Sequence, residues 1–301
     1  MVMKDYTAGQ LAAEDANLLL DALQKQITGI DVTFHSGGGY HNLMIAKPQS
    51  DGGNQPSLQF SNGRLTPPNE LVGDGIRRHL PGSCKELIHV INQAQIILHN
   101  HAFNKARKTK QNDLVNSIWL WGNGNTPALS SFASQFQKTA SLVTASNLLK
   151  GMALSAGIKT TQVPGATGFT NTNYQEKVNA ALRELETHDV VYLQISAAEE
   201  ASLHGDIDDK IMAIEDFDSK VAGRLLNALE GQNNVKILLA VNQVSSVIHM
   251  KYKKDPVPFV VYPAQKGPDQ LKMFDEEILR SGSEQFRDGP TLMQALFRGD
   301  L

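Results

Sequence analysis

Two carboxylates and an imidazole follow one apolar stretch of the chain. Val190–Ile195 reads as a buried strand, and Glu199, Glu200 and His204 come shortly after it, where a helical pattern begins. In an α/β protein the carboxyl end of such a strand is where a site is usually built. Carboxylates and imidazoles are the ligands that Zn²⁺ and Mn²⁺ favour. The segment therefore has side chains of the types that could hold a metal and activate a nucleophile.

Basic and amide side chains form a second candidate group. Guanidinium and ammonium groups bind phosphate and carboxylate, so these residues could line an anion pocket at a cleft between domains. The alternative is that they brace loops, and both interpretations stay open at this stage. The group consists of Asn104, Arg107, Asn116, Lys150 and Lys177.

The second part of the chain alternates apolar strands with helices, which positions the first group. Apolar, β-branched runs between helical patterns indicate a mainly parallel sheet with helices on both faces. The expected helices are 145–156, 174–186 and 208–229. The expected strands are 117–121, 141–144, 190–195, 235–241 and 259–262.

The first part of the chain reads as a smaller α+β unit. A helix is expected over 11–25, followed by strands at 31–35 and 41–46. The segment 47–82 is rich in Pro, Gly, Asn and Ser and is typical of loops. Ser83 and Glu86 have the spacing of a capping box that opens a helix to about residue 99.

Composition excludes several classes of protein. The chain has 301 residues, a net charge of -3 and 41% hydrophobic residues, which fits a globular protein without a basic field for nucleic acid. No apolar run reaches the length of a membrane span, and residues 1–5 are not followed by the apolar stretch of a signal peptide. The single Cys84 excludes an internal disulfide and favours a reducing, cytoplasmic location.

Several long motifs resemble one family. The segment His101–Arg107 is similar to His-Pro-x-Asn-x-x-Arg, and Asn116–Gly124 is similar to Asn-x-Ile-Trp-x-Trp-Gly-x-Gly. Further matches in the same order and spacing are Leu148–Gly151, Pro164–Lys177 and Asp255–Phe259. Together they resemble the archaeal-type, cofactor-independent phosphoglycerate mutases of the alkaline-phosphatase superfamily. The resemblance implies a small inserted-type α+β domain over 1–104 and an alkaline-phosphatase-like core over 105–301.

The same resemblance implies that the metal ligands have changed. At positions where the family has Asp and His ligands, this chain has Glu199, Leu203, Asn242, Gln243 and Tyr252. Only Glu199 could still be an anionic ligand, and neutral amides are poor ligands for Zn²⁺ or Mn²⁺. Displaced ligands that could rescue the site are Glu200, His204 and His249, although a surface role is the simpler interpretation. We therefore expect no bound metal and no other cofactor.

The family's first strand and its Ser or Thr nucleophile have no counterpart in these 301 residues. Without a nucleophile, basic residues can bind a phosphate but cannot transfer it. In the family that strand lies inside the sheet, among the strands equivalent to 190–195 and 235–241. Its absence predicts an open edge, so we expect a homo-oligomer or a partner chain that completes the sheet.

The function expected from this resemblance is that of a non-catalytic homologue, with no catalytic residue in the chain itself. It would bind or sense a phosphorylated three-carbon acid, without nucleic-acid or membrane partners. One alternative is that the chain is part of an active mutase that interconverts 2- and 3-phosphoglycerate and is completed by another chain. Another is a truncated gene product without a selected activity.

Overall fold

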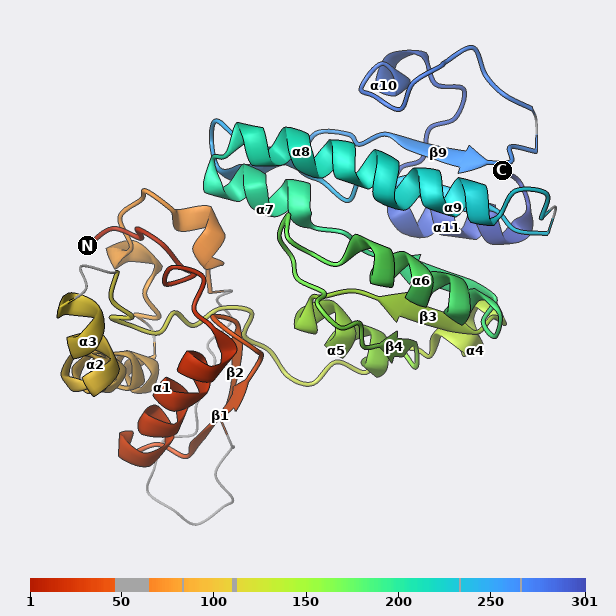
Figure 1. Ribbon diagram of the computed structural model, residues 1–301. Helices are drawn as coiled ribbons and strands as arrows, with labels where there is room; N and C mark the ends of the chain where they lie inside the picture. Colours follow the sequence, from red (N-terminus) through yellow and green to blue (C-terminus); the bar gives the residue numbers. More distant parts are fainter. Residues whose placement is uncertain (47–64, 83, 110–112, 233, 266) are drawn as a thin grey trace. The chain divides into compact units, whose positions relative to one another are not determined.

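The computed structural model describes residues 1–46, 65–82, 84–109, 113–232, 234–265 and 267–301. These residues form two compact units, Met1–Thr126 and Pro127–Leu301 (Figure 1). The boundary lies later than the expected one at residue 104. The reason is that the segment after this residue stays bonded to the first unit: the Asn104 side chain accepts a hydrogen bond from the Val115 backbone N–H.

The first unit packs two long helices beside a hairpin. Leu19 and Leu23 of the first helix and Ala94 and Leu98 of the second form its core, as their spacing on one helical face predicts. The hairpin strands β1 and β2 pair antiparallel. The elements are α1 (Ala13–Gln26), β1 (Val32–Ser36), β2 (Asn42–Ala46), η1 (Pro68–Leu71), η2 (Arg77–His79), α2 (Lys85–Asn100) and α3 (Ala102–Thr109).

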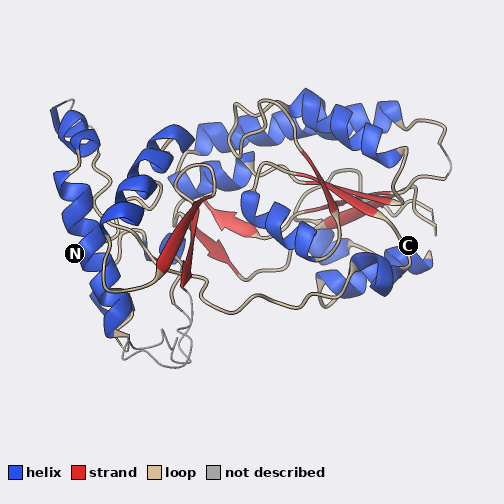
Figure 2. Ribbon diagram, turned by 90° about the horizontal axis from the view of Figure 1, so that it is seen from below, coloured by secondary structure: helices blue, strands red, loops and turns tan. Residues whose placement is uncertain are grey.

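The second unit alternates strands and helices as expected. Figure 2 shows its strands lying between helices. Its first half contains α4 (Phe132–Phe136), β3 (Ala140–Val143), α5 (Asn147–Ser155), β4 (Lys159–Thr161), α6 (Tyr174–Leu185), β5 (Val190–Leu193) and α7 (Ala197–His204). Its second half contains α8 (Ile207–Phe217), the π-helical turn η3 (Asp218–Ala222), α9 (Gly223–Ala228), β6 (Ile237–Ala240), β7 (Val244–Ser246), β8 (Lys251–Lys253), β9 (Phe259–Tyr262), α10 (Ile278–Ser281) and α11 (Gly289–Arg298).

The predicted parallel sheet is confirmed in the order β4-β3-β5, and all its pairs run parallel. The central strand β3 is buried along its whole length, which explains its apolar character. Strands β6 and β9 form a separate antiparallel pair, and β7 and β8 form another. Among the described residues, β5 and β6 therefore each have a neighbouring strand on one side only.

Two local expectations need correction or lie outside the described residues. The strand expected over 117–121 is wrong, because side chains hold this segment instead of a backbone ladder. The Trp119 indole N–H donates to the Thr66 carbonyl, and the Gln95 amide donates to the Ser117 hydroxyl. Ser83 of the expected capping box is outside the described residues, as is 47–64 of the expected loop region.

None of the helices in the described part of the chain has the length and apolarity needed to span a bilayer.

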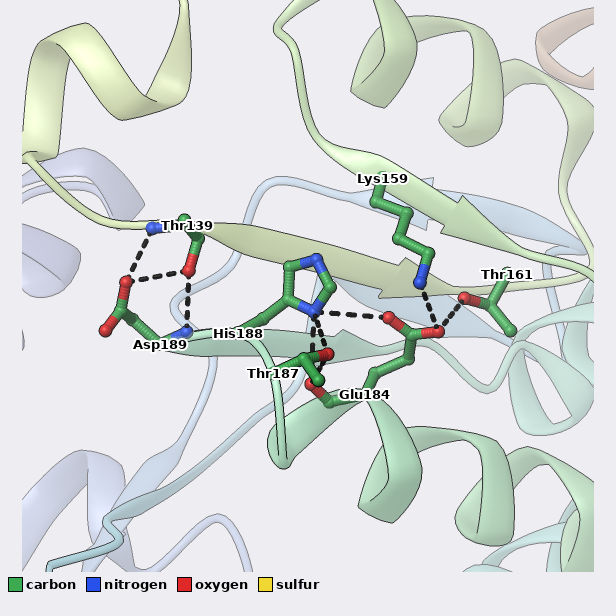
Figure 3. A network of polar contacts seen from close by, with 7 residues as sticks. All are labelled: Thr139, Lys159, Thr161, Glu184, Thr187, His188 and Asp189. Atoms are coloured by element: carbon green, nitrogen blue, oxygen red, sulfur yellow. Dashed lines mark hydrogen bonds and ion pairs between the residues drawn. The ribbon is translucent and has the colours of Figure 1, made fainter.

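A polar network at the amino ends of β3 and β5 ties α6 to the sheet (Figure 3). The buried Glu184 carboxylate of α6 accepts a hydrogen bond from the Thr161 hydroxyl at 2.8 Å. The Lys159 ammonium and the His188 imidazole also contact this carboxylate, at 3.0 Å and 3.3 Å. Glu184 thus connects its own helix to β4 with a charged group that would be costly to bury alone.

Replacing this carboxylate should weaken the fold. We expect Glu184→Gln to lower the free energy of unfolding by about 2 kcal/mol, because hydrogen bonds to a charged group are lost at a buried position. Urea denaturation measures the change. The matched control is Glu186→Gln, which alters an exposed carboxylate on the same segment. Equal stability of the two variants would show that the network contributes nothing.

Candidate functional site

The candidate site lies where β3 and β5 end, at the carboxyl edge of the parallel sheet. Thr144 and Gln194 directly follow these strands, and the Thr144 hydroxyl donates to the Gln194 side-chain oxygen at 2.6 Å. Ser146 caps the following helix α5 by accepting a hydrogen bond from the Leu149 N–H. Thr144, Ser146 and Gln194 thus lie just beyond the carboxyl ends of parallel strands, which is where α/β proteins usually form a binding crevice.

A loop from Pro164 to Gly168 packs against this edge, and a lysine of helix α6 donates a hydrogen bond to it. The Lys177 side chain of α6 is fully buried, and its ammonium donates to the Thr167 carbonyl at 2.9 Å. Burial, and then the positive charge of Lys150, lowers the pKa of Lys177 to about 8. The charge of Lys150 is thus near enough to Lys177 to contribute to the lowering of its pKa.

Glu200 lies close to the same loop at Gly168. A side chain added at Gly168 would lie 3.5 Å from the Ser196 hydroxyl and 3.8 Å from Cγ of Glu200, so the loop is in close contact with the start of α7. Burial, and then the charge of Glu199, raises the pKa of Glu200, whereas His204 lowers it. The Oε2 atom of Glu200 is buried without a hydrogen-bond partner. Burial therefore favours the protonated form of this carboxyl, which is the form that can donate a hydrogen bond to a phosphate oxygen.

The three remaining anion-binding candidates belong to the first unit and are used differently. Both amide hydrogens of Asn104 are donated to backbone carbonyls, of Leu98 and Val115, which matches the loop-bracing alternative. The Arg107 guanidinium donates to the Ala8 carbonyl at 3.3 Å and lies 5.4 Å from the centre of the Phe103 ring. Asn116 is exposed.

The residues at the family's ligand positions are partly brought together. The Tyr252 hydroxyl of β8 donates to Glu199 Oε1 at 2.5 Å, so these two positions converge from α7 and β8. Leu203 is buried with 8% exposure. Asn242 is exposed and Gln243 is half-buried, both between β6 and β7.

The displaced candidates do not assemble into a ligand set either. The His204 Nδ1 atom contacts the Glu200 backbone carbonyl at 2.7 Å, and the ring lies against Phe169. His249 is exposed, and its backbone N–H donates to the Ser246 hydroxyl. The described residues contain no group of three His, Cys, Asp or Glu that could hold a metal ion. This donor set does not fit a pair of divalent ions, which prefer several carboxylate and imidazole ligands.

Comparison with known proteins gives the family. The model of the family described as "Metalloenzyme superfamily" matches residues 4–293. The chain belongs to the metalloenzyme superfamily. It is 33% identical over 303 residues to the "Probable 2,3-bisphosphoglycerate-independent phosphoglycerate mutase" of Geobacter sulfurreducens, covering 98% of this chain and 72% of the relative. It is 34% identical over 286 residues to the 2,3-bisphosphoglycerate-independent phosphoglycerate mutase of Methanosarcina barkeri, covering 93% of this chain and 69% of the relative.

A solved structure supports the alkaline-phosphatase-like fold of this metalloenzyme-superfamily chain. The PH0037 protein from Pyrococcus horikoshii superposes with a TM-score of 0.67 at 19% identity. The match covers 91% of this chain and 66% of that structure's chain, so these 301 residues span less than two thirds of its length. At this identity the likeness concerns the fold alone.

Sequence reasoning missed two features of the site. The unpartnered oxygen of Glu200 depends on the packing of the Gly168 loop, and nothing in the local sequence indicates it. The bond between Thr144 and Gln194 could have been anticipated in part, since both residues lie near the carboxyl ends of the strands expected over 141–144 and 190–195.

Proposed function

We propose that this chain is a non-catalytic member of its superfamily that binds a phosphorylated three-carbon acid. The observation that carries the proposal is the environment of Lys177. The Lys177 side chain is fully buried. The positive charge of Lys150 helps to lower its pKa, and none of the groups that shift this pKa is a carboxylate. A buried cation without a counter-ion is costly, and an anionic ligand would offset that cost.

The other side chains of the site support binding without transfer. Lys150 adds a second positive charge, and the protonated form of Glu200, which burial favours, can donate to a phosphate oxygen. At the metal positions, Glu199 is engaged by Tyr252 and Leu203 has no lone pair to offer. Charge stabilisation without an activated nucleophile gives binding rather than turnover.

Titration calorimetry with 3-phosphoglycerate tests this proposal. We expect Lys177→Met to weaken binding by about tenfold or more, because one charge-assisted hydrogen bond contributes about 1.5–3 kcal/mol. Methionine has a similar length and removes a buried charge, so the fold should be retained. Lys272→Met is the matched control, because it removes an exposed positive charge from the same unit. Absence of binding by the unmodified chain, or equal affinities in both variants, would contradict the proposal.

A second candidate function is that of one part of an active phosphoglycerate mutase that another chain completes. The open edges of β5 and β6 favour it, because they leave room for a further strand in the sheet. This candidate predicts that mutase activity appears only on mixing with a second protein that supplies a nucleophile and metal ligands. If no mutase activity appeared on mixing with such a protein, this second candidate would be contradicted and only the binding function would stand.

A further inference from the structure

Gln194 is fixed at two points where β5 ends. Its backbone N–H donates to the Val143 carbonyl of β3 at 2.9 Å, and its side-chain oxygen accepts a hydrogen bond from the Thr144 hydroxyl at 2.6 Å. The side chain is half-buried, so part of it stays open to solvent at the carboxyl edge of the sheet. The terminal torsion of a glutamine is ordinarily broad, whereas this amide is held by a residue of the neighbouring strand.

Thr144 determines which way the amide points. This residue is buried, and its hydroxyl oxygen accepts a hydrogen bond from the Ser146 N–H at 3.0 Å. Its hydroxyl hydrogen needs an acceptor, and within the described part of the chain that acceptor is Oε1 of Gln194. The NH2 group of Gln194 therefore points away from Thr144, and none of the described residues accepts a hydrogen bond from it.

Helix α5 connects Gln194 with the first lysine of the proposed site. Ser146, whose N–H bonds Thr144, is also the residue that caps this helix. The Ser146 carbonyl accepts a hydrogen bond from the Lys150 N–H at 3.0 Å, so Lys150 lies one helical turn after the cap. The Lys150 side chain is half-buried, and its ammonium has no partner among the residues that the structure describes.

The loop that ends at Gly168 connects Gln194 with the second lysine. A side chain added at Gly168 would lie 3.5 Å from the hydroxyl of Ser196, which is two residues beyond Gln194. The Thr167 carbonyl, just before Gly168, accepts the hydrogen bond from the Lys177 ammonium. The segment that carries Gln194 is thus in contact, at one edge of the sheet, with the segments that position both lysines.

We propose that Gln194 selects a phosphorylated acid over a plain phosphate ester, because its amide donates a hydrogen bond to the carboxylate of the ligand. This inference rests on the proposed function, in which Lys150 and Lys177 attract the phosphate group. The ligand then has its phosphate at the lysines and its carboxylate at the amide. A donor that is already oriented loses little side-chain entropy on binding, and a hydrogen bond to a charged acceptor is stronger than one to a neutral acceptor.

Titration calorimetry with two ligands tests this assignment. Glycerol 3-phosphate has a CH2OH group where 3-phosphoglycerate has its carboxylate. We expect the unmodified chain to bind 3-phosphoglycerate at least about tenfold more tightly, because one hydrogen bond to the carboxylate distinguishes the two ligands.

The variant Gln194→Glu should remove this preference. The new carboxylate repels the carboxylate of the ligand, but it still accepts the hydrogen bond from Thr144, so the fold should be retained. We expect the ratio of the two affinities to fall by about tenfold or more. The matched control is Gln232→Glu, which adds the same charge at an exposed position of the same unit and should leave the ratio unchanged.

A second variant tests Thr144 as the positioning residue. Thr144→Val has nearly the same shape but no hydroxyl to hold the amide, so the affinity for 3-phosphoglycerate should fall by about threefold or more. The affinity for glycerol 3-phosphate should stay the same. A merely structural role of Thr144 would weaken the binding of both ligands equally.

Failure of this inference can be told apart from failure of the proposed function. If the unmodified chain binds neither ligand, the proposed function fails, and the role of Gln194 fails with it. If it binds both ligands equally, or if Gln194→Glu keeps the preference, the phosphate site stands and the role of Gln194 is overturned. If Gln194→Glu does not fold, the ligand preference of the unmodified chain and of Thr144→Val decides the question.

Discussion

The purified chain is expected to retain neither Zn²⁺ nor Mn²⁺ at the stoichiometry of a two-ion site after dialysis against either metal. The structural reason is that Glu199 is engaged by Tyr252, while Leu203 and Gln243 cannot supply anionic or imidazole ligands. Elemental analysis gives the metal content directly, and the melting temperature with and without metal gives an independent reading. The metal content and the melting temperature should both equal those of the chain that was never exposed to metal.

Two ions per chain would contradict this expectation and would direct attention to the displaced candidates. In that case His204→Ala and His249→Ala would each be expected to release metal. The structure gives no support to such a rescue, because His204 contacts a backbone carbonyl and His249 is exposed. If both variants still bound metal, the ligands would have to be residues other than His204 and His249.

Anion affinity should fall steeply as pH rises through the pKa of Lys177, which is about 8. Only the protonated ammonium attracts a phosphate, and the phosphate itself is fully ionised above neutral pH. We expect affinity for 3-phosphoglycerate to decrease about tenfold between pH 7 and pH 9. Calorimetry on the unmodified chain and on Lys177→Met measures this slope, and the variant should lack it. A slope that persists in the variant would assign the titration to another group.

The lowered pKa of Lys177 also affects stability, which should rise with pH over the range in which anion affinity falls. The folded-state pKa of Lys177 lies below the ordinary value of 10.5, so between about pH 8 and 10.5 the unfolded chain binds more protons than the folded chain. The free energy of unfolding should therefore rise with pH across this window. Below pH 8 the full cost of burying the charge remains. Denaturation at both ends of the window should show the difference, and Lys177→Met should remove it.

The alternation of apolar strands and helices was sufficient to predict the parallel core. Val190–Leu193 is a strand of this core where its β-branched run indicated, and Tyr174–Leu185 is a helix. Phe259–Tyr262 is also a strand as expected, but it pairs antiparallel with Ile237–Ala240 outside the parallel core. The strand expected over 117–121 failed for a physical reason. Its aromatic residues are typical of strands, but Trp119 bonds a distant carbonyl, and no strand among the described residues pairs with the segment.

The candidate site was only partly accessible to sequence reasoning. Lys150 and Lys177 were grouped by residue type and motif, and the charge of Lys150 is near enough to contribute to the lowered pKa of Lys177. Arg107 was grouped with them on residue type, but it donates to a backbone carbonyl within the first unit. Glu200 was considered only as a displaced ligand. Its unpartnered oxygen arises from the three-dimensional packing of a loop against a helix, which no local pattern encodes.

A coupled assay for phosphoglycerate mutase, run with Mn²⁺, Zn²⁺ and Mg²⁺ in turn, tests the central claim most directly. The chain is expected to bind 3-phosphoglycerate and to convert none of it, because Lys150 and Lys177 can attract a phosphate but do not supply the activated nucleophile that transfer needs. Conversion by the isolated chain that disappears in Glu199→Gln would contradict this account, since it would show that a working metal site includes the carboxylate that Tyr252 contacts.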